Sequence, residues 1–155
     1  MEIITPKGGD SRMLRVQDIM TRQVIRVDPE EPVAVAARML SRYNVGALPV
    51  CGEDGLIRGV VTDRDIVLRC VAADRDPERT PVRHVMTGRV VTVGVQQSLL
   101  AAAEKMAREQ VRRLPVEDRG RLCGVITLGD IAANQETSME AAEALTEICA
   151  NVSSR

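Results

Sequence analysis

The sequence predicts an α+β fold in which two tandem βαββα repeats pack through their small sheets with pseudo-two-fold symmetry. Two observations support this prediction. The segment VQDIMT at residues 16–21 returns as VRHVMT at residues 82–87, so that Met20 corresponds to Met86, 66 positions later. In both copies, patterns typical of strands and helices then follow in the same order. One copy of roughly 60 residues has too little apolar surface to be stable alone, so the copies should pack together.

Each copy starts with a short helical lead-in that carries the Met-Thr pair. An alternating strand is predicted next, at residues 24–27 and 90–93. The following helix is marked at its start by Pro32 in the first copy and by Ser98 in the second. Its apolar residues recur at helical spacing; they are Val33, Ala36, Ala37 and Leu40, then Leu99, Ala102, Ala103 and Met106.

A hairpin and a final helix complete each copy. The hairpin strands are predicted at residues 47–50 with 56–61, and at residues 114–116 with 122–126. Tight turns at residues 53–55 and 118–120 join them, and the Asp-Gly pair in the first turn is a good hairpin signal. The last helix is predicted to begin near Asp65 and near Asp130.

These elements divide the chain into five segments. We expect a flexible arm at residues 1–13, a first repeat at 14–73, a polar linker at 74–81, a second repeat at 82–134 and an amphipathic helix at 135–155. Thr137 resembles the start of a capping box. The helix is expected to present one apolar face, made of Met139, Ala142, Leu145, Ile148, Cys149 and Val152. It either covers an exposed sheet face or serves a partner copy.

Composition and charge exclude several classes of protein. Apolar residues make up 45% of the chain, but Tyr43 is its single aromatic residue, so the core must be aliphatic. Without aromatic rings, the chain is a poor candidate for binding single-stranded nucleic acid by stacking. The 21 basic and 22 acidic residues leave no basic surface for duplex nucleic acid. We therefore expect no nucleic-acid partner.

The expected compartment is the cytoplasm, with no membrane contact. Residues 1–12 lack the apolar core of a signal peptide, and no apolar run approaches membrane-spanning length. The four cysteines form no CxxC pair and have no neighbouring histidine. We interpret them as small apolar side chains in a reducing cell, and we predict no metal site.

The sequence GVVTDRDI at residues 59–66, echoed by GVITLGDI at residues 124–131, is the strongest functional candidate. A strand that runs into a helix start leaves free backbone N–H groups, which favour anions. The threonine adds a hydroxyl, and the aspartate adds a carboxylate that can accept from two vicinal hydroxyls. The motif is therefore either a nucleotide clamp or a helix cap contributing about 1 kcal/mol, and both roles can coexist.

The doubled element order, with its Met-Thr lead-in, Leu-Pro-Val strand and Gly-x-x-Thr-x-x-Asp motif, resembles the cystathionine β-synthase (CBS) domain pair, or Bateman module. The resemblance covers residues 16–134 and is nearest to small stand-alone bacterial proteins. It implies that the threonine lies near a nucleotide phosphate and that the aspartate binds the ribose. The implied site residues are Thr21, Val24, Val45, Gly46, Ala47, Pro49, Thr62 and Asp65, together with Thr87, Val90, Val111, Arg112, Arg113, Pro115, Thr127 and Asp130.

The resemblance also implies a function. Ligands known in this family include AMP, ADP, ATP and S-adenosylmethionine, and no cofactor is required. We expect a non-catalytic sensor that forms a homodimer and signals to an unidentified protein partner. An enzyme is disfavoured because one histidine and scattered cysteines provide neither an activated nucleophile nor a metal set. The alternative is a structural dimerisation module with vestigial clefts.

The two copies differ beside their motifs. Arg64 could reach a phosphate or form a salt bridge with a neighbouring aspartate, and Gly129 occupies its place in the second copy. Arg112 and Arg113 stand where the first copy has Gly46 and Ala47, either as solvated charges at a strand edge or as ligand contacts. We expect unequal affinities, with the better site at Thr62, Arg64 and Asp65.

Overall fold

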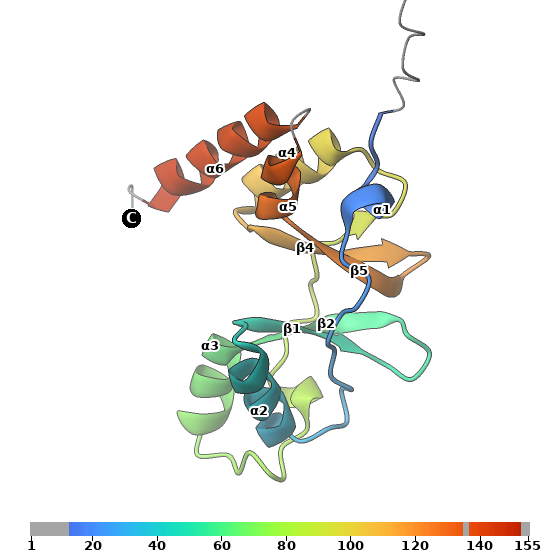
Figure 1. The fold of residues 1–155 in the computed structure, drawn as a ribbon. Helices are drawn as coiled ribbons and strands as arrows, with labels where there is room; N and C mark the ends of the chain where they lie inside the picture. Colours follow the sequence, from blue (N-terminus) through green and yellow to red (C-terminus); the bar gives the residue numbers. More distant parts are fainter. Residues whose placement is uncertain (1–12, 135–136, 153–155) are drawn as a thin grey trace, which may run out of the picture.

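Two small sheets lie face to face in the middle of the protein, and helices cover the outer face of each sheet (Figure 1). The computed structural model describes residues 13–134 and 137–152. In the first sheet, β1 (Ala47–Cys51) pairs antiparallel with β2 (Ile57–Thr62). In the second, β4 (Arg113–Asp118) lies between the parallel strand β3 (Val93–Gly94) and the antiparallel strand β5 (Arg121–Thr127). The predicted α+β fold of two packed repeats is confirmed.

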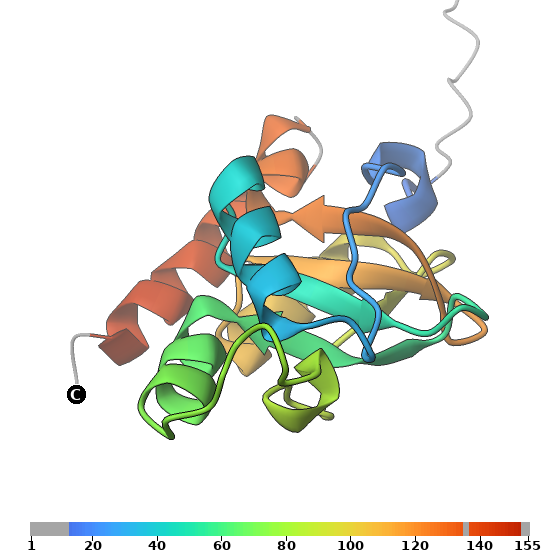
Figure 2. The same ribbon diagram turned by 90° about the horizontal axis from the view of Figure 1, so that it is seen from below.

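Helices flank the sheets in the predicted order. Those of the first repeat are α2 (Val33–Tyr43), α3 (Asp63–Ile66) and the π-helical turn η1 (Val67–Val71) that continues α3. Those of the second repeat are α4 (Leu99–Glu109) and α5 (Leu128–Ala133), and α6 (Ser138–Val152) follows the repeat. The lead-ins contain α1 (Val16–Ile19) and the 3-10 turn η2 (Val82–His84). Seen from below in Figure 2, the strands of one sheet overlie those of the other.

Helices α2 and α4 begin and end as their sequences dictate. Pro32 precedes α2, and the Ser98 hydroxyl caps α4 by accepting from the Ala101 N–H at 3.1 Å. Each helix ends at a residue in the left-handed conformation, Asn44 with φ 51° and Gln110 with φ 59°. Their apolar stripes face the sheets, so each repeat has an aliphatic core between its helices and the outer face of its own sheet.

The lead-ins are exchanged between the two repeats. Val16 and Met20, which precede the first repeat in sequence, pack in the core of the second. Conversely, Val82 and Val85 pack in the core of the first repeat, and Met86 packs against it. Each repeat therefore completes its core with residues from the other copy.

Backbone hydrogen bonds fix this exchange. Thr21 and Val125 exchange two N–H···O bonds of 2.9 Å, which adds Thr21 to the edge of the second sheet. Thr87 and Val60 exchange bonds of 2.9 and 3.0 Å, which adds Thr87 to the edge of the first. The side chain of Arg69 also donates to the carbonyl oxygens of Val85 and Met86, and so binds η1 to the second lead-in.

The prediction of strands at residues 24–27 and 90–93 is wrong over most of their length. The first contributes only an isolated bridge from Val27 to Val50 in β1, and the second only its last residue, Val93, to β3. Both segments cross from one sheet to the other: the first runs from Thr21 at β5 to Val27 at β1. A segment that spans two layers has no neighbouring strand in its middle, so alternation there does not produce a sheet strand.

The exchanged lead-ins explain the glycine that opens each repeated motif. A Cβ on Gly59 would lie 2.5 Å from the Thr87 carbonyl oxygen. A Cβ on Gly124 would lie 2.7 Å from the Met20 sulfur and 2.9 Å from the Thr21 carbonyl oxygen. Only a residue without a Cβ lets the lead-in approach β2 or β5 so closely.

Helix α6 packs on α4 and α5, on the outer side of the second sheet (Figure 1). The helix was expected to cover a sheet face or to serve a partner copy, and the apolar face predicted for it is wrong in part. Ile148 is buried as predicted, but Ala141 and Ala144 replace the larger residues of the expected face. The side chains of Met139 and Leu145 remain 73% and 41% exposed. Small residues let the helices approach closely, which the hydrophobic pattern does not indicate.

Two further predictions concern the N-terminal arm and membrane contact. The arm predicted at residues 1–13 lies outside the described residues except for Met13. Among the described helices, none has the length and apolar character needed to cross a bilayer.

Candidate functional site

Both Thr-x-x-Asp pairs form complete helix caps. In the first copy, the Asp65 N–H donates to Thr62 Oγ1 at 3.0 Å, and the Thr62 N–H donates to Asp65 Oδ2 at 3.0 Å. In the second copy, Asp130 and Thr127 make the same two bonds at 3.1 and 2.8 Å. The capping interpretation is therefore confirmed for both copies.

The caps leave groups for a ligand. Each threonine hydroxyl accepts through its oxygen and keeps its own proton as a donor. Each aspartate uses Oδ2 in the cap, and its other carboxylate oxygen can still accept from two hydroxyls. In the first copy this Asp65 Oδ1 lies 3.9 Å from Arg69 Nη1. All four cap residues are half-buried.

Strand register places residues of the Leu-Pro-Val segments beside the caps. In the first sheet, Ala47 is paired with Thr62, and in the second, Arg113 is paired with Thr127. Because side chains alternate along a strand, these residues share the face opposite to the helix-packed core. Pro49 and Pro115 lie on the same inner faces. These predicted site residues therefore face the space between the two sheets.

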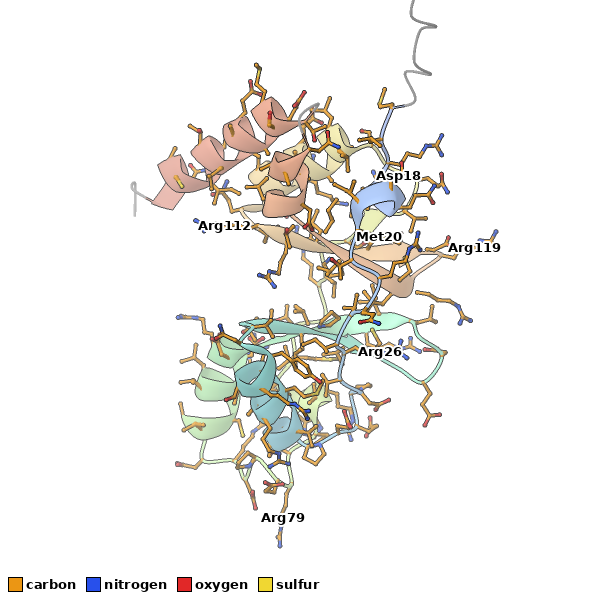
Figure 3. The ribbon with its side chains drawn as sticks, viewed as in Figure 1. Asp18, Met20, Arg26, Arg79, Arg112 and Arg119 are labelled. Carbon is orange, nitrogen blue, oxygen red and sulfur yellow. The ribbon has the colours of Figure 1, made fainter. Side chains whose placement is uncertain are left out.

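The residues just before each strand hold the motif in place through their backbone. The Asp63 N–H donates to the Gly46 carbonyl oxygen at 3.1 Å, and the Leu128 N–H donates to the Arg112 carbonyl oxygen at 2.8 Å. Val45 and Val111 instead turn toward the aliphatic cores, where they are partly buried. Arg112 thus lies at the cap end of the β4–β5 hairpin, whereas Arg119 lies at its tip (Figure 3).

Each cleft is built from both repeats because of the lead-in exchange. Thr62 ends β2, the strand that pairs with Thr87, and Asp65 follows in α3. Thr127 ends β5, the strand that pairs with Thr21, and Asp130 follows in α5. The two sites predicted from sequence are therefore composite. This could not be read from the repeat, which does not indicate where a lead-in packs.

Val24 and Val90 lie farther from the caps than the other predicted residues. The bridges at Thr21 and Thr87 are antiparallel, so the chain runs from them toward the hairpin tips. Val90 there lines a hollow of about 430 Å³, with Ile57, Gly88, Thr92, Glu117 and Gly120. The caps and the Leu-Pro segments form one end of the space between the sheets, and this hollow lies at the other.

Asp63 is the first residue of α3 and pairs with Gly46, one residue beyond the Ala47–Thr62 pair, so alternation places its side chain on the other face from Thr62. Its Oδ1 accepts from the Arg64 N–H at 2.7 Å, and its Oδ2 lies 3.9 Å from the position of a Cβ on Gly46. The carboxylate therefore packs against the segment before Leu-Pro. Within residues 13–134 and 137–152, no carboxylate lies within 4.0 Å of the Arg64 guanidinium, so the salt bridge considered for Arg64 is not formed.

Groups suited to acid–base or metal chemistry are not gathered in these clefts. Among the described residues, no set of three or more His, Cys, Asp or Glu side chains could hold a metal ion. His84 is exposed on η2. Burial raises the pKa of the Cys51 and Cys123 thiols, so both stay protonated at neutral pH.

Comparison with known proteins is consistent with this architecture. The CBS domain family model matches residues 16–71 and 82–136. The CBS domain-containing protein YhcV of Bacillus subtilis is 44% identical over 136 residues, which cover 88% of this chain and 96% of the relative.

Solved structures share the fold. Hypoxic Response Protein I, crystallised with two coordinated zinc ions, is 36% identical with a TM-score of 0.70, over 78% of this chain and 98% of its own. The CBS domain pair of MJ0100, in complex with 5′-methylthioadenosine and S-adenosyl-L-methionine, is 26% identical with a TM-score of 0.65. That match covers 78% of this chain and 94% of the other.

Proposed function

The chain belongs to the CBS domain family, as a small protein with two CBS domains, and we propose that it is a non-catalytic regulatory module that binds adenine nucleotides or related adenosine ligands. The observation that carries this proposal is the pair of Thr-x-x-Asp caps at one end of the space between the sheets. Each cap keeps a hydroxyl donor and a carboxylate acceptor, which suit a 5′ substituent and the hydroxyls of a ribose.

Several features support an adenosine ligand. The related CBS pair of MJ0100 binds two adenosine compounds. Aliphatic side chains and backbone can enclose a base in a chain that has no Phe or Trp. AMP, ADP, ATP and S-adenosylmethionine are therefore the ligands to test, and we expect the protein to act in the cytoplasm.

The composite clefts suggest how binding is transmitted. A ligand in either cleft contacts the caps of one repeat and the lead-in of the other. It therefore stabilises the relative packing of the repeats in which both parts are correctly placed. The change would be read by a separate protein partner or through assembly of the chain.

The function is tested by isothermal titration with AMP, ATP and S-adenosylmethionine, run beside an assay for nucleotide turnover. Stoichiometric binding without turnover is expected. Hydrolysis of a nucleotide would contradict a non-catalytic module. If none of these compounds binds, the alternative of a structural dimerisation module with vestigial clefts is favoured.

We also propose that the protein is a homodimer, because apolar side chains remain exposed on helices of both repeats. Val67, Leu68 and Val71 of η1 are 50–61% exposed, and Met139 and Leu145 of α6 are also uncovered. Burying such side chains against a second copy would remove about 25 cal/mol per Å² of apolar area from water. A patch of this kind is typical of a protein–protein contact.

The double substitution Leu68→Glu and Leu145→Glu is predicted to convert the dimer to a monomer, because it places charges in an apolar contact. Size-exclusion chromatography with light scattering measures the mass. Arg79→Glu, at a side chain that is 88% exposed, is the control and should remain dimeric. A double variant that stays dimeric would place the interface elsewhere.

A further inference from the structure

The side chain of Arg69 joins the cap of the first repeat to the second lead-in. Its Nη1 donates to the carbonyl oxygens of Val85 and Met86 at 3.0 and 3.1 Å. The same atom lies 3.9 Å from Asp65 Oδ1, the carboxylate oxygen that the cap with Thr62 leaves unused. A guanidinium NH2 group has two protons, so each carbonyl oxygen can receive one of them. One charged group therefore contacts both parts.

The local helix geometry brings the guanidinium to this position. Asp65 and Arg69 are four residues apart on the continuous helical run of α3 and η1, so their side chains lie on one face. In η1 the Ala72 N–H donates to the Val67 carbonyl oxygen at 2.8 Å, which is a π-helical step. Single π-helical turns inside helices are rare and occur frequently at functional sites. This turn is a second indication, separate from the hydrogen bonds of Arg69, that the segment has a functional role.

Arg69 holds the second lead-in at the point where it joins the first sheet. Val82 and Val85 of this lead-in are fully buried in the first core. Directly after them, Thr87 exchanges backbone bonds of 2.9 and 3.0 Å with Val60 in β2. Carbonyl groups at the end of a helical turn have no partner inside the turn, and a basic side chain can replace it. Arg69 provides this replacement for η2 and so fixes the residues just before Thr87.

The second repeat has an asparagine in place of this arginine. Asp130 lies 65 positions after Asp65, and Asn134 lies 65 positions after Arg69. Helix α5 ends at Ala133, and Asn134 follows it with an extended backbone, at φ −87° and ψ 124°. An uncharged side chain cannot form the ion pair that Arg69 forms with its aspartate. The caps of the two repeats therefore differ in how they are connected to the lead-ins.

We infer, building on the proposed function, that Arg69 is a positioning residue that transmits ligand binding from the first cap to the second lead-in. It orients the Asp65 carboxylate by its charge and holds the lead-in by two hydrogen bonds, so a movement of either part disturbs the other. A ligand bound to Asp65 therefore stabilises the exchanged packing of the second lead-in. With Asn134 at the equivalent position, binding in the second cleft is transmitted to the first lead-in less strongly.

Amide hydrogen exchange, followed by NMR, measures how firmly each lead-in is held when no ligand is present. The N–H groups of Thr87 and Thr21 are matched probes, because each donates at 2.9 Å to a strand of the repeat on which its lead-in packs. In Arg69→Gln, exchange should become roughly tenfold faster at Thr87 and stay within about twofold of the wild type at Thr21. Arg38→Gln, which removes an exposed ion pair with Glu78, is the control and should change neither rate.

Two results of this comparison overturn the inference. The first is an unchanged exchange rate at Thr87 in Arg69→Gln. The second is an equal acceleration at Thr87 and Thr21, which would show only a general loss of stability. Arg69→Lys is the second variant, for use if Arg69→Gln does not fold, because it keeps the charge and replaces the planar guanidinium by an ammonium. It should accelerate exchange about threefold at Thr87 alone, and the same two results would overturn the inference.

The transmission itself is tested with ligand in an Asp130→Asn background, which weakens the second cleft. Saturation with each of AMP, ATP and S-adenosylmethionine that binds should slow exchange at Thr87 about fivefold. Adding Arg69→Gln should reduce this protection to less than about twofold, although the compound still binds. Equal protection with and without Arg69 would overturn the inference and leave the proposed function standing. If no compound binds, the proposed function fails and the transmission with it, whereas ligand-free exchange still decides whether Arg69 holds the lead-in.

Discussion

Replacing Gly59 with alanine is expected to lower the free energy of unfolding by about 2–3 kcal/mol, at the upper end of overpacking effects. The added methyl group would lie 2.5 Å from the Thr87 carbonyl oxygen and 3.0 Å from the Met86 sulfur. The methionine side chain can turn away, but the carbonyl oxygen belongs to the bridge that holds the second lead-in on β2. The lead-in must therefore move, and the core that it completes opens.

Thermal and urea unfolding measure this effect. A loss of that size corresponds to a fall in the melting temperature of about 5–10 °C in a chain of this length. Gly88→Ala is the matched control, because no atom lies within 4 Å of its Cβ position. It should change the stability by less than about 0.5 kcal/mol. Equal melting temperatures for the two variants would show that the lead-in does not approach β2 as closely as described.

Much of the fold could be predicted because its signals are local or repeated. The period of the apolar residues predicted α2 and α4, Pro32 and Ser98 marked their starts, and the turn residues predicted both hairpins. The exchange of the lead-ins could not be predicted in this way. The apolar residues in a short segment such as 16–21 indicate that it packs against a hydrophobic core. They do not indicate which core, because the two repeats have cores of nearly the same sequence.

Part of the candidate site could also be predicted, because its signal is repeated in the sequence. Thr62, Asp65, Thr127 and Asp130 were found because one motif occurs twice, and strand register brings Ala47 or Arg113 beside them. Which lead-in faces which cap depends on the exchange, so the composition of each cleft required coordinates.

The aspartates of the two caps provide the second large effect, on ligand affinity. Asp65→Asn and Asp130→Asn keep an oxygen that can accept from the threonine N–H, but they remove the charge that a ribose would meet. Hydrogen bonds to a charged group contribute about 1.5–3 kcal/mol each, so each variant should lose roughly tenfold to a hundredfold in the affinity of its own cleft. Titration with ATP, AMP and S-adenosylmethionine measures the loss.

Alanine at the same positions separates the two roles of these residues. Asp65→Ala and Asp130→Ala should lose as much affinity as the asparagine variants, and also about 1 kcal/mol of stability because the cap is broken. Asp18→Ala is the control: its carboxylate accepts from the Arg15 N–H at 2.8 Å, which is the carboxylate half of such a cap, at the start of α1 and outside both clefts. It should lose stability and keep full affinity. If the asparagine variants bind every ligand as the wild type does, the carboxylates act only as caps, and the clefts do not bind ribose through them.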